Sequence, residues 1–418
     1  MKTPPSQTLI NSTSYPTEFQ QIILEKSQNF IGREFIFTAI TDFLHRHKRG
    51  YFTIVGVPGS GKSAILAKYV TENYHVIYYN AQIVGKNTAE EFLKTVCTNL
   101  VENATSLNAG NPRRRVAPLH VTSLQDETSL YPIPDNATQG SWFLSLLLQK
   151  ISDRLEPPQR LIIAIDALDA IDPNSQPPGT NLFYLPRYLP DRVYFLLTRR
   201  PFKREKSGLL IEAPSQILDL SEYPEENRED VQAYIREYLT SLSHDGECRN
   251  VASSECRDVA CNVSTSHNIN EQEFGTDAHL LDVMHRLTTA SENNFMYLHH
   301  TLNAIAEDFD SQPYQFDCIP PGLEAYYQQH WQKMKSEGLS DLVLKVLSVL
   351  TCAETGEISA KGISQAIAED EYDVEEILEN WLEFLQQHRI GKETRYSFYH
   401  SHFRLWLAKQ ISKTNGEC

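Results

Sequence analysis

Hydrophobic and polar positions follow three different patterns along the 418 residues of this chain. Between residues 51 and 220, short runs of consecutive apolar residues alternate with segments whose apolar positions recur every three or four residues. Continuous runs of this length are typical of strands buried on both faces of a parallel sheet, and the spacing between them is typical of helices. The pattern predicts an α/β domain with a doubly wound parallel sheet, whose strands we expect at Tyr51–Val55, Val76–Tyr79, Leu161–Ile165, 192–200 and Ile217–Leu220.

The remainder of the chain predicts two further domains. Only helical spacing is present up to about residue 335, and helices expected at about 340–350, 359–368 and 372–386 then precede the hairpin-like stretch HRIGKETRYSFYH. Flexible insertions are predicted where periodicity gives way to Asn, Ser, Gly and Pro. The expected organisation is a polar N-terminal arm (1–28), the α/β domain (29–222, insertion at about 104–138), a small helical domain (223–335, insertion at about 243–276), a winged-helix domain (336–411) and a tail (412–418).

The first expected strand leads into a glycine-rich loop and a helix, in the stretch YFTIVGVPGSGKSAILAKYV. Glycines let such a loop approach phosphate oxygens closely, and the backbone N–H groups then meet those oxygens at the positive end of the helix. A lysine here is a cation for the β- and γ-phosphates, and the following serine offers a hydroxyl to Mg²⁺. A plain glycine turn is the alternative, but strand, loop and helix together favour a P-loop that binds nucleotide through Gly56, Pro58, Gly59, Ser60, Gly61, Lys62, Ser63 and Ala64.

A second chemical signal follows the strand in LIIAIDALDA. Asp166 ends this buried strand, and the carboxyl ends of parallel strands meet at one edge of a sheet, where the P-loop also lies. We therefore expect Asp166 to hold Mg²⁺, directly or through water, opposite Ser63. An aspartate that merely starts a turn is the alternative interpretation. Asp169 is the next carboxylate and a candidate catalytic residue.

These motifs resemble the nucleotide-binding core of STAND ATPases of the NACHT type and of AAA+ ATPases, including the Orc-like ones. The phrase NFIGREF, upstream of the P-loop, is similar to the N-terminal box of these families. The resemblance implies that Phe30, Ile31, Gly32 and Arg33 pack beside the adenine and ribose. Two positions depart from the families, because many AAA+ proteins have Glu where this chain has Ala167, and many STAND proteins have Glu where it has Ala170.

Two further roles follow from the same resemblance. The strand RVYFLLTRRPF ends similarly to the sensor 1 segment of STAND proteins, which makes Arg200 the γ-phosphate sensor, with Thr198 beside it and Arg199 as the competing arginine. The stretch FYHSHFRLWLA resembles the NACHT phrase whose histidine contacts the β-phosphate of ADP, a role that falls on His400, with His402 as the nearby alternative. Both stretches have plainer interpretations as surface arginines and a packed histidine.

The function implied by the resemblance is that of a signal-transduction switch with ATP or ADP and Mg²⁺ as cofactors. ADP would hold the domains closed, whereas nucleotide exchange and slow Mg²⁺-dependent ATP hydrolysis by Asp166, Asp169 and Arg200 would control opening and self-assembly. STAND proteins typically attach an effector and a repeat array, and this chain shows no repeat period. Two interpretations stay open: a separate protein supplies the sensor or effector, or the chain is a fragment of a split gene. The alternatives are an Orc-like AAA+ DNA-associated ATPase and a nucleotide-binding scaffold with little turnover.

Net charge, the length of apolar runs and cysteine spacing limit the partners and the cellular location that we expect. The formal net charge of −16 argues against a nucleic-acid or acidic-membrane partner held by the whole surface. No apolar run reaches the length of a membrane span, and the polar start lacks a signal-peptide core, so we expect a cytoplasmic protein without membrane contact. Cys248, Cys256 and Cys261 lie near two histidines, but their spacing lacks a C-x₂-C pair, and a flexible insertion is the preferred interpretation over a metal site.

Overall fold

A computed structural model describes residues 15–73, 75–83, 85–106, 133–202, 208–251, 274–307, 323–336, 338–353, 357–390 and 393–414. The chain forms two compact units. The first comprises residues 1–222 together with Leu378–Gln386, and the second comprises Tyr223–Ile377 and Gln387–Cys418. None of the described helices is long and apolar enough to span a bilayer.

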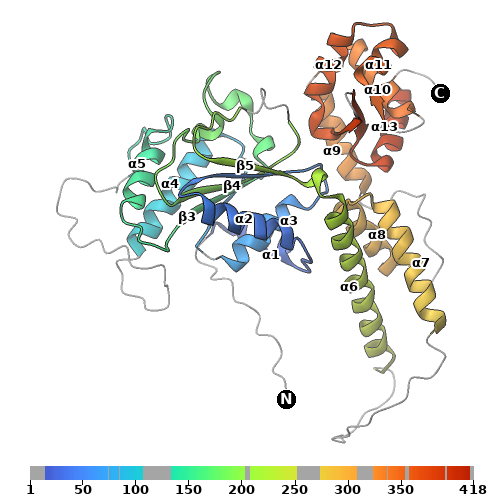
Figure 1. Ribbon diagram of the computed structural model, residues 1–418, viewed down its shortest axis with the longest axis horizontal. Helices are drawn as coiled ribbons and strands as arrows, with labels where there is room; N and C mark the ends of the chain where they lie inside the picture. The colour runs from blue at the N-terminus through green and yellow to red at the C-terminus, as the bar shows by residue number, and fades with distance from the viewer. Residues whose placement is uncertain are drawn as a thin grey trace, which may run out of the picture. The chain divides into compact units, whose positions relative to one another are not determined.

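The first unit is built on a five-stranded sheet in the order β2-β3-β4-β1-β5 (Figure 1). Its strands pair in parallel, β1 with β4 and β5, and β3 with β2 and β4, as the continuous apolar runs predicted. Every residue of β1 and β4 is buried, and the rings of Tyr51 and Phe195 stack at 5.0 Å between these two neighbouring strands. The strands are β1 (Gly50–Val55), β2 (Ile77–Asn80), β3 (Leu161–Asp166), β4 (Val193–Arg199) and β5 (Ser215–Asp219).

Helices cover the sheet because each presents an apolar face to it. On α2, Ile36, Ile40 and Phe43 are fully buried, and the ring of Phe43 lies 5.6 Å from that of Phe52 on β1. Figure 1 shows α1, α2 and α3 beneath the strands and α4 and α5 towards the β3 side of the sheet. The helices of this unit are α1 (Thr17–Ser27), α2 (Glu34–Arg46), α3 (Lys62–Glu72), α4 (Ala89–Ser106) and α5 (Trp142–Ser152).

The strand register places the predicted site residues at one edge. Val55 pairs with Arg199, Asn80 pairs with Asp166, and β4 lies between β1 and β3. Because the strands are parallel, the P-loop after β1, the acidic turn after β3 and the arginines at the end of β4 all lie at the carboxyl edge of the sheet. The sheet topology therefore brings together motifs that are more than a hundred residues apart in sequence.

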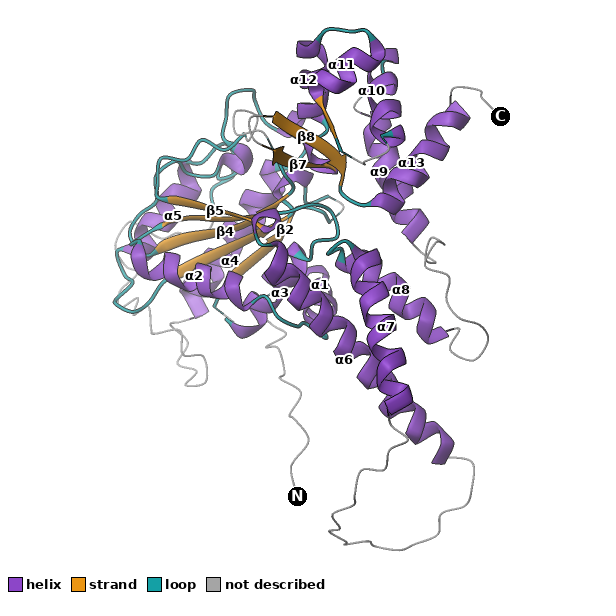
Figure 2. Cartoon of the chain, turned by 45° about the vertical axis from the view of Figure 1, so that its right-hand side comes forward, coloured by secondary structure: helices purple, strands orange, loops and turns teal. Residues whose placement is uncertain are grey.

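The second unit is mainly helical. Its first helices pack around a core of Val231, Ile235, Leu287, Leu298 and Leu302, all fully buried. A small three-stranded sheet, in the order β6-β8-β7, accompanies the later helices (Figure 2). The elements from residue 223 onward are α6 (Pro224–Val251), α7 (Phe274–Ser291), α8 (Phe295–Glu307), α9 (Leu323–Ser336), α10 (Asp341–Cys352), β6 (Ile358–Ser359), α11 (Ala360–Ile367), α12 (Glu371–Asn380), η6 (Leu382–Phe384), β7 (Leu385–Ile390), β8 (Glu393–Phe398) and α13 (Ser401–Thr414).

Three sequence predictions need correction. The helix expected over 372–386 ends at Asn380, because the chain then turns through η6 into β7, which pairs with β8 in the small sheet. The insertions are shorter than expected, because α4 continues to Ser106, α6 continues to Val251 and α7 begins at Phe274. The remaining parts, about 107–132 and 252–273, lie outside the described residues and include Cys256 and Cys261.

Candidate nucleotide-binding site

The P-loop joins β1 to α3 and has the backbone that its glycines permit. Gly59 and Gly61 have φ angles of 80° and 90°, a left-handed conformation that residues with a Cβ rarely adopt. Gly56 is required for a different reason, because a Cβ there would lie 2.7 Å from Ser60 Oγ and 2.9 Å from Leu220 Cδ1. The loop therefore requires glycine at Gly59 and Gly61 for its backbone conformation and at Gly56 for space.

Lys62 begins α3 and folds back over the loop. Its Nζ donates hydrogen bonds to the carbonyl oxygens of Gly56 at 2.7 Å and Val57 at 2.9 Å. Burial lowers the pKa of Lys62 to about 8, against the opposing influence of Asp169, while Arg200 lowers it further. A partly desolvated ammonium in this position has few water contacts to lose when it meets a phosphate.

Arg33 supports the loop from the segment before α2. The residue is 2% exposed, has a φ of 68°, and donates from Nη2 to the carbonyl oxygen of Ser60 at 2.8 Å. The ring of Phe30 lies 5.8 Å from that of Phe37. The structure thus joins the NFIGREF phrase to the P-loop, and the expected contacts of Phe30, Ile31, Gly32 and Arg33 with adenine and ribose stay a prediction.

Asp166 is fully buried at the end of β3, among donors from two neighbouring strands. Thr198 Oγ1 donates to Oδ1 at 2.5 Å, while Tyr78 Oη and Asn80 Nδ2 donate to Oδ2 at 3.2 and 3.1 Å. Ser63 also donates to this carboxylate. Burial raises the pKa of Asp166, and these hydrogen bonds oppose the rise because they favour the charged form.

The turn after β3 directs a second carboxylate towards β4. Ala167 has a φ of 56° and donates its N–H to Thr198 Oγ1 at 2.9 Å. Asp169 then accepts the backbone N–H of Arg200 at Oδ1, at 2.9 Å, and contacts the guanidinium Nε through Oδ2 at 3.3 Å. Arg200 is therefore held next to the turn, whereas the guanidinium of Arg199 lies over the ring of Phe202 at 3.5 Å.

His400 lies in the second unit and has no exposed surface. Its ring is 4.8 Å from that of Tyr297 and 5.5 Å from that of His402, and its Nδ1 accepts the backbone N–H of His402 at 3.2 Å. Burial lowers the pKa of His400 to about 4, opposed mainly by the negative charge of Glu292. Its proposed contact with the β-phosphate of ADP stays a prediction.

Sequence reasoning did not identify three residues that the structure brings to the first unit's site. Tyr78 lies within the strand expected at Val76–Tyr79, and Asn80 follows it directly, a polar residue at a strand end that is a recognisable signal at a parallel-sheet edge. Glu383 contacts Arg200 from a segment 183 residues away. No local pattern marks that contact, because Glu383 is one of many acidic residues in its region.

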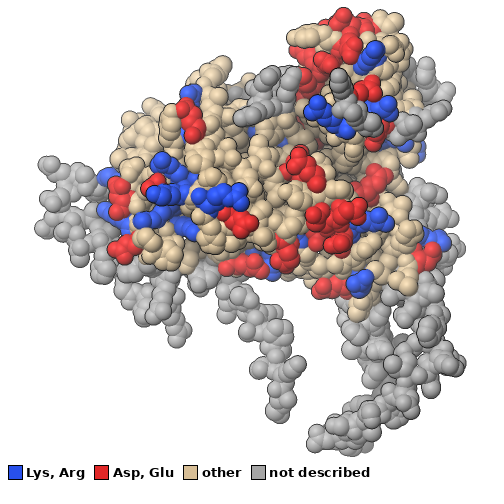
Figure 3. Space-filling model, in the orientation of Figure 1, with Lys and Arg blue, Asp and Glu red and all other residues tan. Residues whose placement is uncertain are grey.

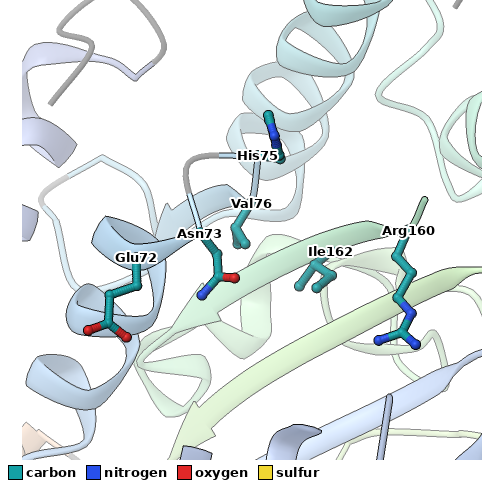
Figure 4. A pocket seen from close by; sticks show the side chains of 6 residues that line it. All are labelled: Glu72, Asn73, His75, Val76, Arg160 and Ile162. Atoms are coloured by element: carbon teal, nitrogen blue, oxygen red, sulfur yellow. The ribbon is translucent and has the colours of Figure 1, made fainter. Parts of the chain in front are cut away.

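A separate pocket lies at the opposite end of the sheet (Figure 4). Its volume is about 230 Å³, and it contains none of the predicted site residues. Arg160 precedes β3 and Val76 precedes β2, so the pocket lies at the amino edge, away from the P-loop. Its lining residues are Glu72, Asn73, His75, Val76, Arg160 and Ile162.

The residues at the carboxyl edge suit a nucleotide with its magnesium ion. The loop offers a cradle that a Cβ at Gly56 would obstruct, with a cation at Lys62 and a hydroxyl at Ser63. Within the described part of the chain, no group of three or more His, Cys, Asp or Glu side chains could hold a metal ion by itself. A magnesium ion here would therefore depend on phosphate oxygens and water as well as on Ser63 and Asp166.

Comparison with known proteins found one matching domain family and a set of similar solved structures. Residues 29–196 match the family described as the AAA ATPase domain. No curated protein is similar enough to count as a relative. Among solved structures, the chain is similar to Drosophila ORC bound to DNA, with 13% identity, 96% of this chain and 99% of that chain covered, and a TM-score of 0.36. A variant RuvB of Thermotoga maritima has 12% identity, coverage of 95% and 99%, and a TM-score of 0.32.

The family match covers the P-loop, the Asp166 turn and most of β4. It coincides with the part of the chain in which the parallel sheet places Lys62, Ser63 and Asp166 together. Sequence match and sheet topology together support a P-loop nucleotide-binding domain of the AAA ATPase type over residues 29–196.

Proposed function

We propose that this chain is an ATP- and ADP-binding switch of the STAND/NACHT class, which exchanges nucleotide and hydrolyses ATP slowly. One observation supports this most directly. Three charged side chains gather where three strands end at a single edge of the sheet. They are the P-loop cation Lys62 after β1, the buried carboxylate Asp166 at the end of β3, and Arg200 after β4, which its neighbours hold in place. This is the donor set that a nucleoside triphosphate with Mg²⁺ requires.

In this proposal the chain binds and orients phosphates more than it performs proton chemistry. When bound, ATP with Mg²⁺ supplies the phosphoanhydride bond that is broken. The loop N–H groups and Lys62 hold the phosphates, and Ser63 offers its hydroxyl to the metal. Four donors already surround Asp166, and a carboxylate has about four lone-pair positions, so we infer that Asp166 acts on magnesium through water.

Slow turnover follows from the surroundings of the remaining carboxylate. Both oxygens of Asp169 already contact Arg200, through its backbone N–H and its guanidinium. A carboxylate engaged in this way is poorly placed to polarise a water molecule. Ala170 stands where a second carboxylate could assist. The same features are compatible with a nucleotide-binding scaffold without turnover, which measurement of phosphate release would reveal.

In the proposed switch, the second unit contains the domain that responds to the nucleotide. We propose that helix α10, helices α11 and α12 and the β6-β8-β7 sheet form a winged helix, and that His400 on its final segment recognises the β-phosphate of ADP. Loss of that contact on exchange for ATP would favour an open, self-assembling form. A separate sensor or effector partner and a cytoplasmic location also belong to this proposal.

The test is to measure nucleotide in the purified chain after denaturing extraction. We expect one ADP per parent chain, less in His400→Ala and almost none in Lys62→Ala. Lys68→Ala is the matched control, because Lys68 lies on the same helix and pairs with Glu72 at the surface. A parent chain that retains no nucleotide would contradict the switch.

A positive surface region favours a second candidate, a DNA-associated ATPase. Figure 3 shows Lys and Arg side chains gathered over the region of α2 and β3, although the chain as a whole carries a net charge of −16. Exposed basic residues precede β1 at Arg46, Lys48 and Arg49. DNA that accelerates ATP hydrolysis, in a manner weakened by added salt, would favour this candidate over the switch.

A further inference from the structure

Arg200 lies between two carboxylates that come from distant parts of the first unit. Asp169 contacts its Nε at 3.3 Å, and Glu383 contacts its Nη1 at 3.4 Å. The side chains of Arg200, Asp169 and Glu383 are 15%, 16% and 13% exposed. Partly buried charges are screened less than surface pairs, so the Coulombic attraction across this contact is stronger than in an exposed ion pair of the same length.

Glu383 is held in place by the apolar residues around it. It lies on η6, where Leu382 is 4% exposed and Phe384 is fully buried. The ring of Phe384 also lies 5.4 Å from the guanidinium carbon of Arg200. Two successive residues of one anchored segment therefore face the same arginine, and the acidic one does not depend on a flexible surface side chain.

Asp169 makes two contacts with Arg200 that do not involve Glu383. It accepts the backbone N–H of Arg200 and contacts the guanidinium from the adjacent turn. Glu383 contributes a second negative charge at Nη1, one of the donors through which a guanidinium binds phosphate oxygens. A carboxylate at that donor occupies an N–H that a terminal phosphate would use, and it repels the charge of that phosphate.

We propose that Glu383 is a built-in competitor of the ATP γ-phosphate for Arg200, which makes the chain prefer ADP. This rests on the proposed function, because it assumes that Arg200 contacts the γ-phosphate. ATP has to displace Glu383 from Arg200 or tolerate its charge, whereas ADP leaves the pair intact. Glu383 thereby weakens ATP binding selectively and sets the nucleotide ratio at which the chain changes state.

The experiment compares the dissociation constants of ATP and ADP, with Mg²⁺, for the nucleotide-free parent and for Glu383→Gln. Glutamine keeps the size and a hydrogen-bonding oxygen but removes the charge. We expect ATP to bind about threefold to tenfold more tightly, the range of a partly screened charge pair, while ADP affinity changes less than twofold. Glu376→Gln removes the same charge from an exposed position on α12 and should leave both constants unchanged.

Arg200→Gln and the double variant separate this inference from the proposed function. If Glu383 acts through Arg200, Glu383→Gln has no effect on the ATP/ADP ratio in the Arg200→Gln background. An Arg200→Gln variant with weaker ATP binding, together with a silent Glu383→Gln, would overturn the competitor and leave the proposed function intact. An unchanged ratio in Arg200→Gln would instead remove the assigned role of Arg200.

Glu383→Asp guards against a Gln variant that folds poorly. Aspartate keeps the charge and withdraws it by one methylene from a contact that is already 3.4 Å long. We expect ATP affinity between those of the parent and Glu383→Gln. Weaker ATP binding in Glu383→Asp than in the parent would contradict competition, because the charge of the shorter side chain lies further from Arg200 and repels the γ-phosphate less.

Discussion

Thr198 and Asp166 are joined by a 2.5 Å hydrogen bond between two fully buried side chains of neighbouring strands. The same Thr198 hydroxyl accepts the N–H of Ala167 at 2.9 Å. One side chain of β4 thus fixes both the carboxylate that ends β3 and the first residue of the turn that follows. Through Ala167, the hydroxyl links the packing of β4 against β3 to the position of Asp169, which lies two residues after Ala167 in the turn.

Thr198→Val should therefore lower both the stability of the fold and the rate of ATP hydrolysis. Valine has nearly the shape of threonine but leaves the Ala167 N–H and one oxygen of Asp166 without this partner. We expect a loss of about 1–3 kcal/mol in the free energy of unfolding, measured by urea titration, and slower phosphate release. Thr198→Ser keeps the hydroxyl and is the control. A valine variant as stable as the parent would show that other groups fix the turn.

Arg33→Met tests the connection between the NFIGREF phrase and the P-loop. Methionine retains much of the apolar stem but removes the hydrogen bond to the carbonyl oxygen of Ser60. Because this contact is buried, we expect the loop to lose order and ADP affinity to fall about tenfold, measured by calorimetry. Arg46→Met, at an exposed position at the end of the following helix α2, should leave affinity unchanged. Equal affinities of the two variants would contradict a supporting role for Arg33.

The elements that the sequence predicted well are those whose signal is local. The apolar runs of β1, β3 and β4 predicted the boundaries of these strands to within about one residue. The glycines predicted where the P-loop lies, because a positive φ and a close approach depend on single residues. The edge at which Asp166 lies also followed, since parallel strands share one carboxyl edge.

The elements that the sequence did not predict depend on contacts between distant segments. Helix α12 ends earlier than expected, because the chain after Asn380 turns through η6 into β7, whose partner strand β8 lies beside it in the small sheet. The contact of Glu383 with Arg200 joins residues whose neighbours in sequence give no indication of each other. Such pairings need the fold before they can be recognised.

Ala170→Glu tests whether a missing carboxylate limits turnover. Ala170 ends the 3₁₀ turn Leu168–Ala170, next to Asp169, which is already engaged by Arg200. A glutamate there would add an acceptor for the attacking water, and we expect phosphate release to rise at least about tenfold, a fraction of what general bases contribute. Ala170→Gln, without a basic oxygen, should not reproduce the increase. Equal rates in the parent and the Glu variant would favour the scaffold interpretation.

The pH dependence of stability should carry a contribution from His400. Its pKa of about 4 in the folded chain is below the ordinary value of about 6.5, so the unfolded chain binds more protons between these values. This contribution is fully present above pH 6.5 and is lost as the pH falls towards 4. From pH 7 to pH 5 we expect a loss of about 2 kcal/mol in the free energy of unfolding. The groups around the ring are Glu292, which opposes the shift, His402 and Tyr297.

His400→Phe isolates this contribution because it keeps a ring against Tyr297 and cannot titrate. Urea titrations at pH 7 and pH 5, followed by tryptophan fluorescence, report on the second unit through Trp331 and Trp406. We expect the variant to lose less stability than the parent over this interval, by about 2 kcal/mol, whereas His402→Phe should retain most of the parent's pH dependence. Parallel pH dependences in the parent and His400→Phe would contradict this prediction. They would show that the pKa of His400 is the same in the folded and the unfolded chain, because another group offsets the effect of burial on the charged ring.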